Sequence, residues 1–532
     1  AGILRAGALV FTAHVLFKLA GLIQYAVMGH YMGPELIEPV YVTVFEGCIF
    51  TLFLIGEEVI GPAFLPVFMG ERDGKSENAA WRFAGTVLSV QFLLLLVVSL
   101  GVMVFPGAVI RLLTAWGPTE QAGRYELARE SLVCMAPALI CLSLGSTTYM
   151  ILNGYKRFFL AAFGDAVWKF TVVIAVIAGV GIFGIDYEAL IFGLVLGSIA
   201  KLLTHVTGML REIRFVRFRI DLKNPAVRAM FFLVLPLICG IIFAKVRDVF
   251  NHVWVLSRLE ESGLMQANSF GRKLYSAVGW LIPYSLSIAM FPFFCEMADR
   301  EDWTGLGDMI SNSARMLLSV FIPASMVALV LAEPLTFLVF HGGELSSRVA
   351  GLTSVSTACY TLVLPAVAVE YLLMQAFFAS KRMISVTITG IVFSALSMGI
   401  SALGIVVLGL KGAEALAVVA LGFVLSRTLK SLTLVVILKR KLRFFPAAET
   451  MVFLFRSFAV GLVAAIFSLL FVKGFESFIS VSNAKVVLLL KISGGAAGAS
   501  AGFALGTALF RLEEPMNMCR WGMRFLSSRK DA

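Results

Sequence analysis

The feature that most constrains this chain is a series of long apolar stretches in which apolar and polar residues do not alternate. They recur between residues 7 and 510, and most exceed the length of about 20 residues that a membrane-spanning helix requires. A strand of a membrane barrel would instead need about 10 residues in which apolar and polar side chains alternate. We therefore expect an all-α polytopic membrane protein.

The composition excludes the main alternatives to a membrane protein. Apolar residues make up 59% of the chain and charged residues 14%, whereas soluble proteins have about 45–50% and about 25%. This excludes a soluble enzyme, a disordered chain and a fibrous protein. The five histidines and seven cysteines form no metal-binding pattern, so we expect no metal and no cofactor. The net charge of +11 fits cytoplasmic loops that face anionic lipid, and we expect membrane lipids rather than nucleic acid as partners.

The apolar stretches define about fourteen predicted spans. They lie at residues 7–32, 38–68, 79–105, 129–153, 158–183, 187–210, 227–257, 264–296, 309–340, 349–378, 384–408, 412–438, 451–473 and 486–510. The second span contains Gly56, Gly61, Pro62 and Pro66, and the eighth contains Gly279 and Pro283. Such residues predict bends at backbone that faces protein or a cavity.

The two interrupted spans fall at corresponding places and indicate two pseudo-symmetric bundles with a site between them. We predict an N-terminal bundle of six spans over residues 1–215 and a C-terminal bundle of six spans over residues 216–445. Residues 446–532 would add two spans and a basic tail. The small-residue stretch G-G-A-A-G-A-S-A-G at 494–502 suits close contact between helices.

The distribution of basic residues predicts the orientation. Loops after even-numbered spans are basic, the richest being R-E-I-R-F-V-R-F-R-I-D-L-K at 211–223, and the tail is basic as well. The loops at 33–39 and 184–188 contain no Lys or Arg. The positive-inside rule then places both termini in the cytoplasm.

Ionisable residues inside the spans are candidates for the functional site, because a charge in hydrocarbon costs several kcal/mol. The candidates are Lys18, Glu46, Glu57, Glu58, Asp165, Lys169, Lys245, Arg247, Asp248, His252, Arg272, Lys273 and Glu370. Lys18 and Arg272 come from different predicted bundles. Two cations that face one cavity would suit an anionic substrate, with Arg fitting phosphate through its planar donors.

Some of these charges have a structural interpretation. Asp165 and Lys169 are spaced i,i+4 and can pair along one helix face. Asp248 can neutralise Arg247 or Lys245, which precede it on the same span.

Motifs for catalysis or nucleotide binding are absent from the sequence. It contains no G-x-x-x-x-G-K-[ST] loop, no nucleophile–base pattern and no G-x-G-x-x-G fingerprint after a strand. We therefore expect a secondary transporter or flippase that works by alternating access, without an ATP site of its own, and not an enzyme.

Five stretches resemble the MurJ (MviN) family of lipid II flippases, within the MOP superfamily that also holds MATE drug exporters and polysaccharide flippases. They are F-K-L-A-G-L-I-Q-Y-A-V-M-G-H-Y-M-G (17–33), G-E-E-V-I-G-P-A-F-L-P-V-F (56–68), I-L-N-G-Y-K-R-F (151–158), N-S-F-G-R-K-L-Y with I-P-Y-S-L-S-I-A-M-F-P (268–292), and F-L-V-F-H-G-G-E-L (337–345). The resemblance implies a MOP-type fold in the bacterial cytoplasmic membrane. It also implies a monomer that moves an undecaprenyl-pyrophosphate-linked peptidoglycan precursor, lipid II, to the outer leaflet for cell-wall synthesis.

The resemblance also suggests which residues bind the substrate. Lys18 and Arg272 occupy family Arg positions, and Glu57 occupies the family Glu of the second stretch. Gln24 and Leu52 stand where the family has cavity arginines, so two cavity cations are missing. The predicted substrate-binding set is Lys18, Gln24, Glu57, Arg247, Asp248 and Arg272. Arg247, Lys245 and His30 are the candidates to compensate for the missing cations.

Three other functions remain open at this point. The chain could flip another lipid-linked glycan. It could be a MATE-like antiporter for organic cations, which would use the acidic residues Glu46, Glu57 and Asp248. It could also be a membrane enzyme that acts on a polyprenyl phosphate, with metal-binding carboxylates in the 299–302 cluster after span eight.

The energy source of a flippase without ATP would be the membrane potential or a coupled monovalent ion. Moving an anion out of a negative interior is favoured by about 2.3 kcal/mol per charge per 100 mV. The return of an empty, cationic cavity inward would be favoured for the same reason.

Overall fold

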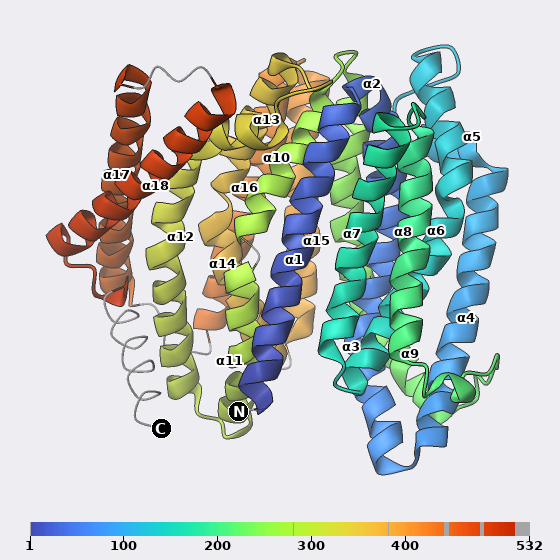
Figure 1. Ribbon diagram of the computed structural model, residues 1–532. Coiled ribbons are helices and arrows are strands. Elements are labelled where there is room, and N and C mark those ends of the chain that lie inside the picture. The colour runs from blue at the N-terminus through green and yellow to red at the C-terminus, as the bar shows by residue number, and fades with distance from the viewer. Residues whose placement is uncertain (1, 280, 381, 441–445, 479–482, 516–532) are drawn as a thin grey trace. The chain divides into compact units, whose positions relative to one another are not determined.

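The computed structural model describes residues 2–279, 281–380, 382–440, 446–478 and 483–515 (Figure 1). Within these ranges the named elements are all helices, and the one β contact is an isolated bridge between Gly342 and Leu345. The all-α prediction is confirmed. The chain divides into two compact units: unit 1 comprises residues 1–266 and 340–347, and unit 2 comprises residues 267–339 and 348–532.

Unit 1 contains a series of long helices with short helical connections. They are α1 (Gly2–Tyr31), α2 (Pro34–Leu36), the π-helix η1 (Ile37–Phe50), α3 (Thr51–Gly74), α4 (Glu77–Val104), α5 (Pro106–Leu113), α6 (Ala122–Gly154), α7 (Phe158–Gly181), α8 (Glu188–Gly208), η2 (Ile213–Phe215), α9 (Pro225–Val249), η3 (Phe250–Trp254) and η4 (Leu256–Arg258).

The helix α10 (Leu264–Gly279) begins at the end of unit 1 and continues into unit 2. The remaining helices of unit 2 are α11 (Leu281–Asp299), α12 (Trp303–Phe340), α13 (Ser347–Thr361), α14 (Leu364–Ala379), α15 (Met383–Ala402), η5 (Leu403–Val407), α16 (Gly412–Lys439), α17 (Ala447–Phe478) and α18 (Ala484–Leu509).

Most of the predicted spans correspond to helices long and apolar enough to cross a membrane. Among the described residues there are 10 such helices, or up to 12 if each of two bent pairs counts as one span. Two predicted spans are helical but are not among these candidate spans. The span 7–32 corresponds to α1, and the span 264–296 corresponds to α10 with α11. The count of fourteen therefore stays a prediction.

The bends lie at different places from those predicted. Span two is one continuous helical run, Pro34–Gly74, which passes Pro66 without a break. Bends of more than 40° instead separate Pro225–Leu235 from Ile238–Arg258, by 49°, and Ser347–Thr361 from Leu364–Ala379, by 46°. Neighbouring helices can satisfy the backbone groups that a proline leaves free, so proline in a span predicts a break only weakly. The bend predicted at Gly279 and Pro283 in span eight stays a prediction, because residue 280 between α10 and α11 lies outside the described residues.

The packing places the unit boundary later than the predicted bundle boundary. In unit 1, α1 packs on α7, α7 on α8, α8 on α6, and α3 on both α6 and α9. Because α9 packs on α3, the chain up to Gln266 belongs to unit 1. The symmetric division into residues 1–215, 216–445 and 446–532 stays a prediction.

The surface of the described spans is apolar, as a lipid environment requires. Leu94, Val97 and Val104 on α4 are each more than 60% exposed. A soluble protein would bury such a stripe, whereas a bilayer solvates it.

The small-residue stretch in α18 makes the close contact that its sequence predicts. A Cβ atom on Gly498 would lie 2.7 Å from the backbone oxygen of Phe467 on α17. A Cβ on Gly502 would lie 2.9 Å from the Cα of Ala464. Only glycine therefore lets α17 and α18 approach this closely.

Candidate functional site

A buried ion pair joins α7 and α8 in unit 1. Lys201 Nζ lies 2.6 Å from Asp165 Oδ1, and the Lys201 side chain is 1% exposed. The helical repeat explains why the Lys201 side chain is buried. Phe192, Leu196 and Leu203 are exposed on one face of α8, and Lys201 lies on the opposite face. Sequence analysis missed Lys201, although a lysine inside a span was the available signal.

Lys169 has a different environment from the one predicted. Its Nζ lies 3.9 Å from the centroid of the Trp168 ring, which is a cation–π distance, and the residue is buried. Asp165, its predicted i,i+4 partner, contacts Lys201 from the neighbouring helix. Tertiary packing thus supplied a partner that local spacing could not indicate.

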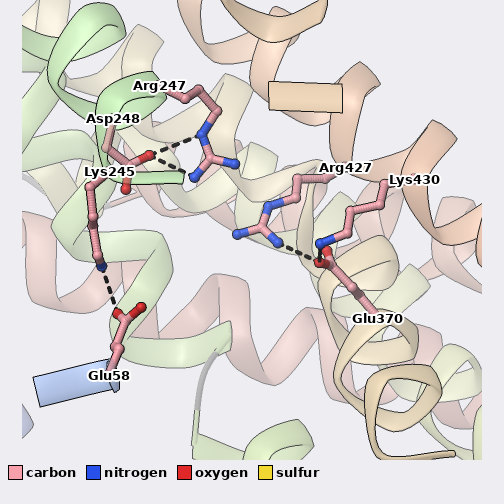
Figure 2. Close-up of polar contacts among 7 residues, drawn as sticks. All are labelled: Glu58, Lys245, Arg247, Asp248, Glu370, Arg427 and Lys430. Atoms are coloured by element: carbon pink, nitrogen blue, oxygen red, sulfur yellow. Dashed lines mark hydrogen bonds and ion pairs between the residues drawn. The ribbon is translucent and has the colours of Figure 1, made fainter. Parts of the chain in front are cut away.

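Two glutamates of α3 join the same group of charges. Lys245 on α9 donates a hydrogen bond to Glu58 Oε1 over 2.6 Å, as Figure 2 shows. Coulombic interactions link Glu57 to Lys201, Asp165 and Lys245. We call Glu57, Glu58, Asp165, Lys201 and Lys245 the unit 1 cluster. Its three carboxylates outnumber its two lysines by one, so its formal charge is −1.

A fully buried histidine lies beside the unit 1 cluster. His205 Nδ1 lies 3.0 Å from the Gly145 carbonyl oxygen, and Nε2 lies 3.0 Å from the Ala161 carbonyl oxygen. Each ring nitrogen therefore has an acceptor in reach, and a protonated imidazole can donate to both. The ring interacts electrostatically with Lys201 and Asp165.

Arg247 and Asp248 form a neutral pair on α9. Arg247 Nη2 lies 2.7 Å and Nε lies 3.1 Å from Asp248 Oδ1 (Figure 2). Of the two cations that Asp248 was predicted to neutralise, it contacts Arg247, while Lys245 contacts Glu58.

Gln24 and Tyr25 on α1 are buried in unit 1. Gln24 is fully buried and donates to the Tyr41 hydroxyl over 3.4 Å. Tyr25 donates to the Glu46 carboxylate. Glu46, one of the acids that a cation antiporter would require, is therefore already hydrogen-bonded to a neutral partner.

A buried glutamate, Glu38, fixes the beginning of α10. Glu38 Oε1 accepts hydrogen bonds from the backbone N–H groups of Gly263, Met265 and Gln266, over 3.0, 2.8 and 3.2 Å. A carboxylate suits the positive end of a helix and satisfies its free N–H groups. Arg124 Nη1 lies 3.5 Å from the other oxygen of Glu38. Sequence analysis placed Glu38 in the loop at 33–39 and could not indicate a partner more than 200 residues away.

Lys18 and Arg272 lie in different units. Lys18 is on α1 in unit 1, Arg272 is on α10 in unit 2, and both are half-buried. Each is described within its own unit, so a cavity shared by the two stays a prediction.

In unit 2, one buried carboxylate holds two cations. Glu370 on α14 is 2% exposed, and its Oε1 accepts from Arg427 Nη1 over 2.6 Å and from Lys430 Nζ over 2.7 Å (Figure 2). Both cations are on α16, three residues apart. We call these residues the unit 2 triad; its formal charge is +1. Sequence analysis singled out Glu370 but missed the two cations, whose i,i+3 spacing inside a span was the available signal.

The acidic cluster after span eight has a structural role where it is described. Asp302 Oδ1 accepts from the backbone N–H of Gly305 over 2.9 Å and from the Thr304 hydroxyl over 3.0 Å, at the start of α12. Glu301 and Asp302 are exposed. Among the described residues, no group of three or more His, Cys, Asp or Glu is arranged to hold a metal ion.

Comparison with known proteins gives a consistent result. The family described as "Lipid II flippase MurJ" matches residues 28–489. The probable lipid II flippase MurJ of Rhizobium meliloti (strain 1021) is 22% identical over 388 residues, which cover 72% of this chain and 71% of the relative. The protein of the same name from Borreliella burgdorferi is 22% identical over 411 residues, which cover 76% and 78%.

Solved structures share the fold. A lipid II flippase MurJ in an inward closed conformation matches with a TM-score of 0.71 at 18% identity, covering 94% of this chain and 99% of that chain. An inward-facing MATE family transporter of the MOP superfamily matches with a TM-score of 0.66 at 12% identity, covering 80% and 94%.

Proposed function

This chain belongs to the lipid II flippase MurJ family, and from that premise we propose that it moves lipid II from the inner to the outer leaflet of the bacterial cytoplasmic membrane by alternating access. The observation that carries the proposal is the family match, which extends over residues 28–489 and so includes parts of both units. The substrate would be a pyrophosphate-linked peptidoglycan precursor on an undecaprenyl tail.

The charges inside the spans support an anionic substrate. Lys18 and Arg272 would contact the pyrophosphate, and Glu57 would sense or gate its entry. Gln24 stands where the family has a cavity arginine. Its side-chain amide would donate a hydrogen bond to the head group but carries no charge. Arg247 is neutralised by Asp248, so this pair would orient the head group through hydrogen bonds and add no net charge.

The same contacts argue against export of organic cations. A cation antiporter needs carboxylates that remain free for the drug. Glu46 accepts a hydrogen bond from Tyr25, and Asp248 is paired with Arg247. The third acid, Glu57, interacts electrostatically with Lys201 and Lys245.

We also propose the features of the transport cycle that follow from a flippase without its own ATP site. The protein would act as a monomer, with both termini in the cytoplasm. The membrane potential would drive an anionic head group outward, at about 2.3 kcal/mol per charge per 100 mV. A coupled monovalent ion would bind at the unit 1 cluster, because a formal charge of −1 inside a span favours a proton or another small cation. Glu57 is the group that could accept the proton.

The test is lipid II translocation in liposomes that contain the purified protein, with an imposed inside-negative potential. Lys18→Ala and Arg272→Ala are expected to reduce the rate at least about tenfold, the effect of losing one hydrogen bond to a charged group. Lys75→Ala is the matched control, since Lys75 is an exposed cation that pairs with Glu71 outside the site. If the wild type translocates a cationic drug but not lipid II, the proposed function is wrong.

A further inference from the structure

Apolar and charged residues alternate in the chain that connects α8 to α9. Residues 216–223 read V-R-F-R-I-D-L-K, with an apolar residue at every even position and a charged residue at every odd position. The short helix before them ends at Val216, whose backbone is extended (φ −69°, ψ 112°), and α9 begins only at Pro225. In extended backbone, successive side chains point to opposite sides. This segment therefore separates a set of apolar side chains from a set of charged ones.

The main chain of this segment is attached to α4. The backbone N–H of Arg219 donates a hydrogen bond to Ser89 Oγ over 2.9 Å. The carbonyl oxygen of Arg217 lies against Gly85, where a Cβ atom would be 2.9 Å from it. Figure 1 shows this green connection beside the lower end of α4. Because main-chain atoms make these contacts, they fix the segment in place and leave its side chains free to meet a partner.

The apolar side chains of the segment do not pack into the protein. The exposed fraction is 67% for Phe218, 53% for Ile220 and 58% for Leu222. Several large apolar side chains exposed together mark a surface that meets a partner or a membrane.

The segment lies at the edge of the lipid-facing surface of unit 1. On α4 the exposed large apolar residues begin at Phe92, which is about 4.5 Å along the helix from Ser89. On α9 they begin at Phe231, and Leu210 after the end of α8 is exposed as well. An apolar and basic segment at this edge is at the depth of the phospholipid head groups.

The connection carries more positive charge than its own acids neutralise. Its five cations, all exposed, are Arg211, Arg214, Arg217, Arg219 and Lys223. Its two acids are already paired with cations from elsewhere in unit 1. Glu212 pairs with Arg157 over 2.7 Å, and Asp221 pairs with Arg82 over 3.3 Å. Within the part of the chain that the structure describes, none of the five cations forms a salt bridge, so their charge is available to an anionic partner.

We propose that residues 210–223 bind anionic phospholipids of the surrounding bilayer. The arginines contact the head-group phosphates, which their planar donors suit, and Phe218, Ile220 and Leu222 enter the upper part of the acyl chains. The positive-inside rule predicts that this connection is cytoplasmic, and the cytoplasmic leaflet has a negative surface potential. The inference goes beyond the proposed function, because the bound lipid belongs to the bilayer and is not the transported substrate.

The experiment titrates photoactivatable phosphatidylglycerol onto the purified full-length protein in a neutral detergent and quantifies crosslinks at residues 210–223 by mass spectrometry. We expect half-maximal crosslinking at a lower concentration than with phosphatidylcholine that carries the same photoactivatable chain. The double variant Arg217→Gln with Arg219→Gln should weaken phosphatidylglycerol binding about 25-fold, because each cation near an anionic surface contributes about a fivefold factor. The double variant Phe218→Ser with Ile220→Ser should weaken the binding of both lipids.

The matched control is Lys75→Gln with Arg300→Gln, which removes the same charge from two exposed cations that pair with Glu71 and Glu296. It should bind phosphatidylglycerol at residues 210–223 like the wild type, and thermal unfolding is recorded for every variant to confirm folding. Unchanged phosphatidylglycerol affinity in the arginine variant would overturn the inference. Equal affinity of the wild type for the two lipids would also overturn it, and this comparison needs no variant. Displacement of the lipid by an equal concentration of glycerol phosphate would show a site for free phosphate and would contradict the inference as well.

Discussion

Replacing Lys201 with methionine would remove a buried counter-charge from the three carboxylates of the unit 1 cluster. Lys201 is 1% exposed, and its Nζ lies 2.6 Å from Asp165. Methionine fills a similar volume but leaves the unit 1 cluster with three carboxylates and one lysine, so its formal charge falls from −1 to −2. The change therefore acts through charge more than through packing.

The expected loss of stability follows from the burial of the two partners. Breaking a buried ion pair by removing one partner costs about 3–5 kcal/mol. The Asp165 side chain is 21% exposed, so solvent screens part of its charge, and we expect about 3 kcal/mol. The double variant Lys201→Met with Asp165→Asn should recover most of this, because a pair replaced by neutral groups leaves no uncompensated charge.

The assay is chemical unfolding of the purified protein in detergent, compared with Lys75→Met. Lys75 pairs with Glu71 over 2.8 Å and is 61% exposed, so its loss should change stability by less than about 1 kcal/mol. If Lys201→Met lowers the free energy of unfolding no more than Lys75→Met does, or if the double variant is as unstable as the single one, Lys201 is not an essential counter-charge of the unit 1 cluster.

Three further predictions concern helix contacts. Gly498→Leu should destabilise the α17–α18 pair by about 1–3 kcal/mol through overpacking, measured by chemical unfolding, whereas Gly474→Leu on α17 should not, because a Cβ there meets nothing within 4 Å. Gly343→Ala should shift thermal unfolding to lower temperature, because the φ angle of Gly343 is +62° and a Cβ atom there would lie 1.9 Å from the His30 carbonyl oxygen. The control is Gly351→Ala, which should be neutral or stabilising because a Cβ atom there meets open space. Glu38→Ala should speed amide hydrogen exchange at the start of α10 and cost about 1–3 kcal/mol, since it frees three backbone N–H groups; unchanged exchange there would mean that Glu38 does not cap the helix.

The sequence was sufficient to predict the helical class and the limits of many spans, because both depend on local hydrophobicity. The predicted span 384–408, for example, corresponds to the helical run Met383–Val407. Local spacing also placed ionisable residues correctly inside the spans. It could not identify their partners, because Asp165 has a lysine at i+4 but contacts Lys201 on another helix.

The contacts that sequence analysis missed depend on which helix faces come together. Glu38 meets backbone groups more than 200 residues away. Glu370 was recognised as a charge inside a span, but its two partners follow about 60 residues later on α16. Only the packing of α14 against α16 turns three separate ionisable residues into one charged site.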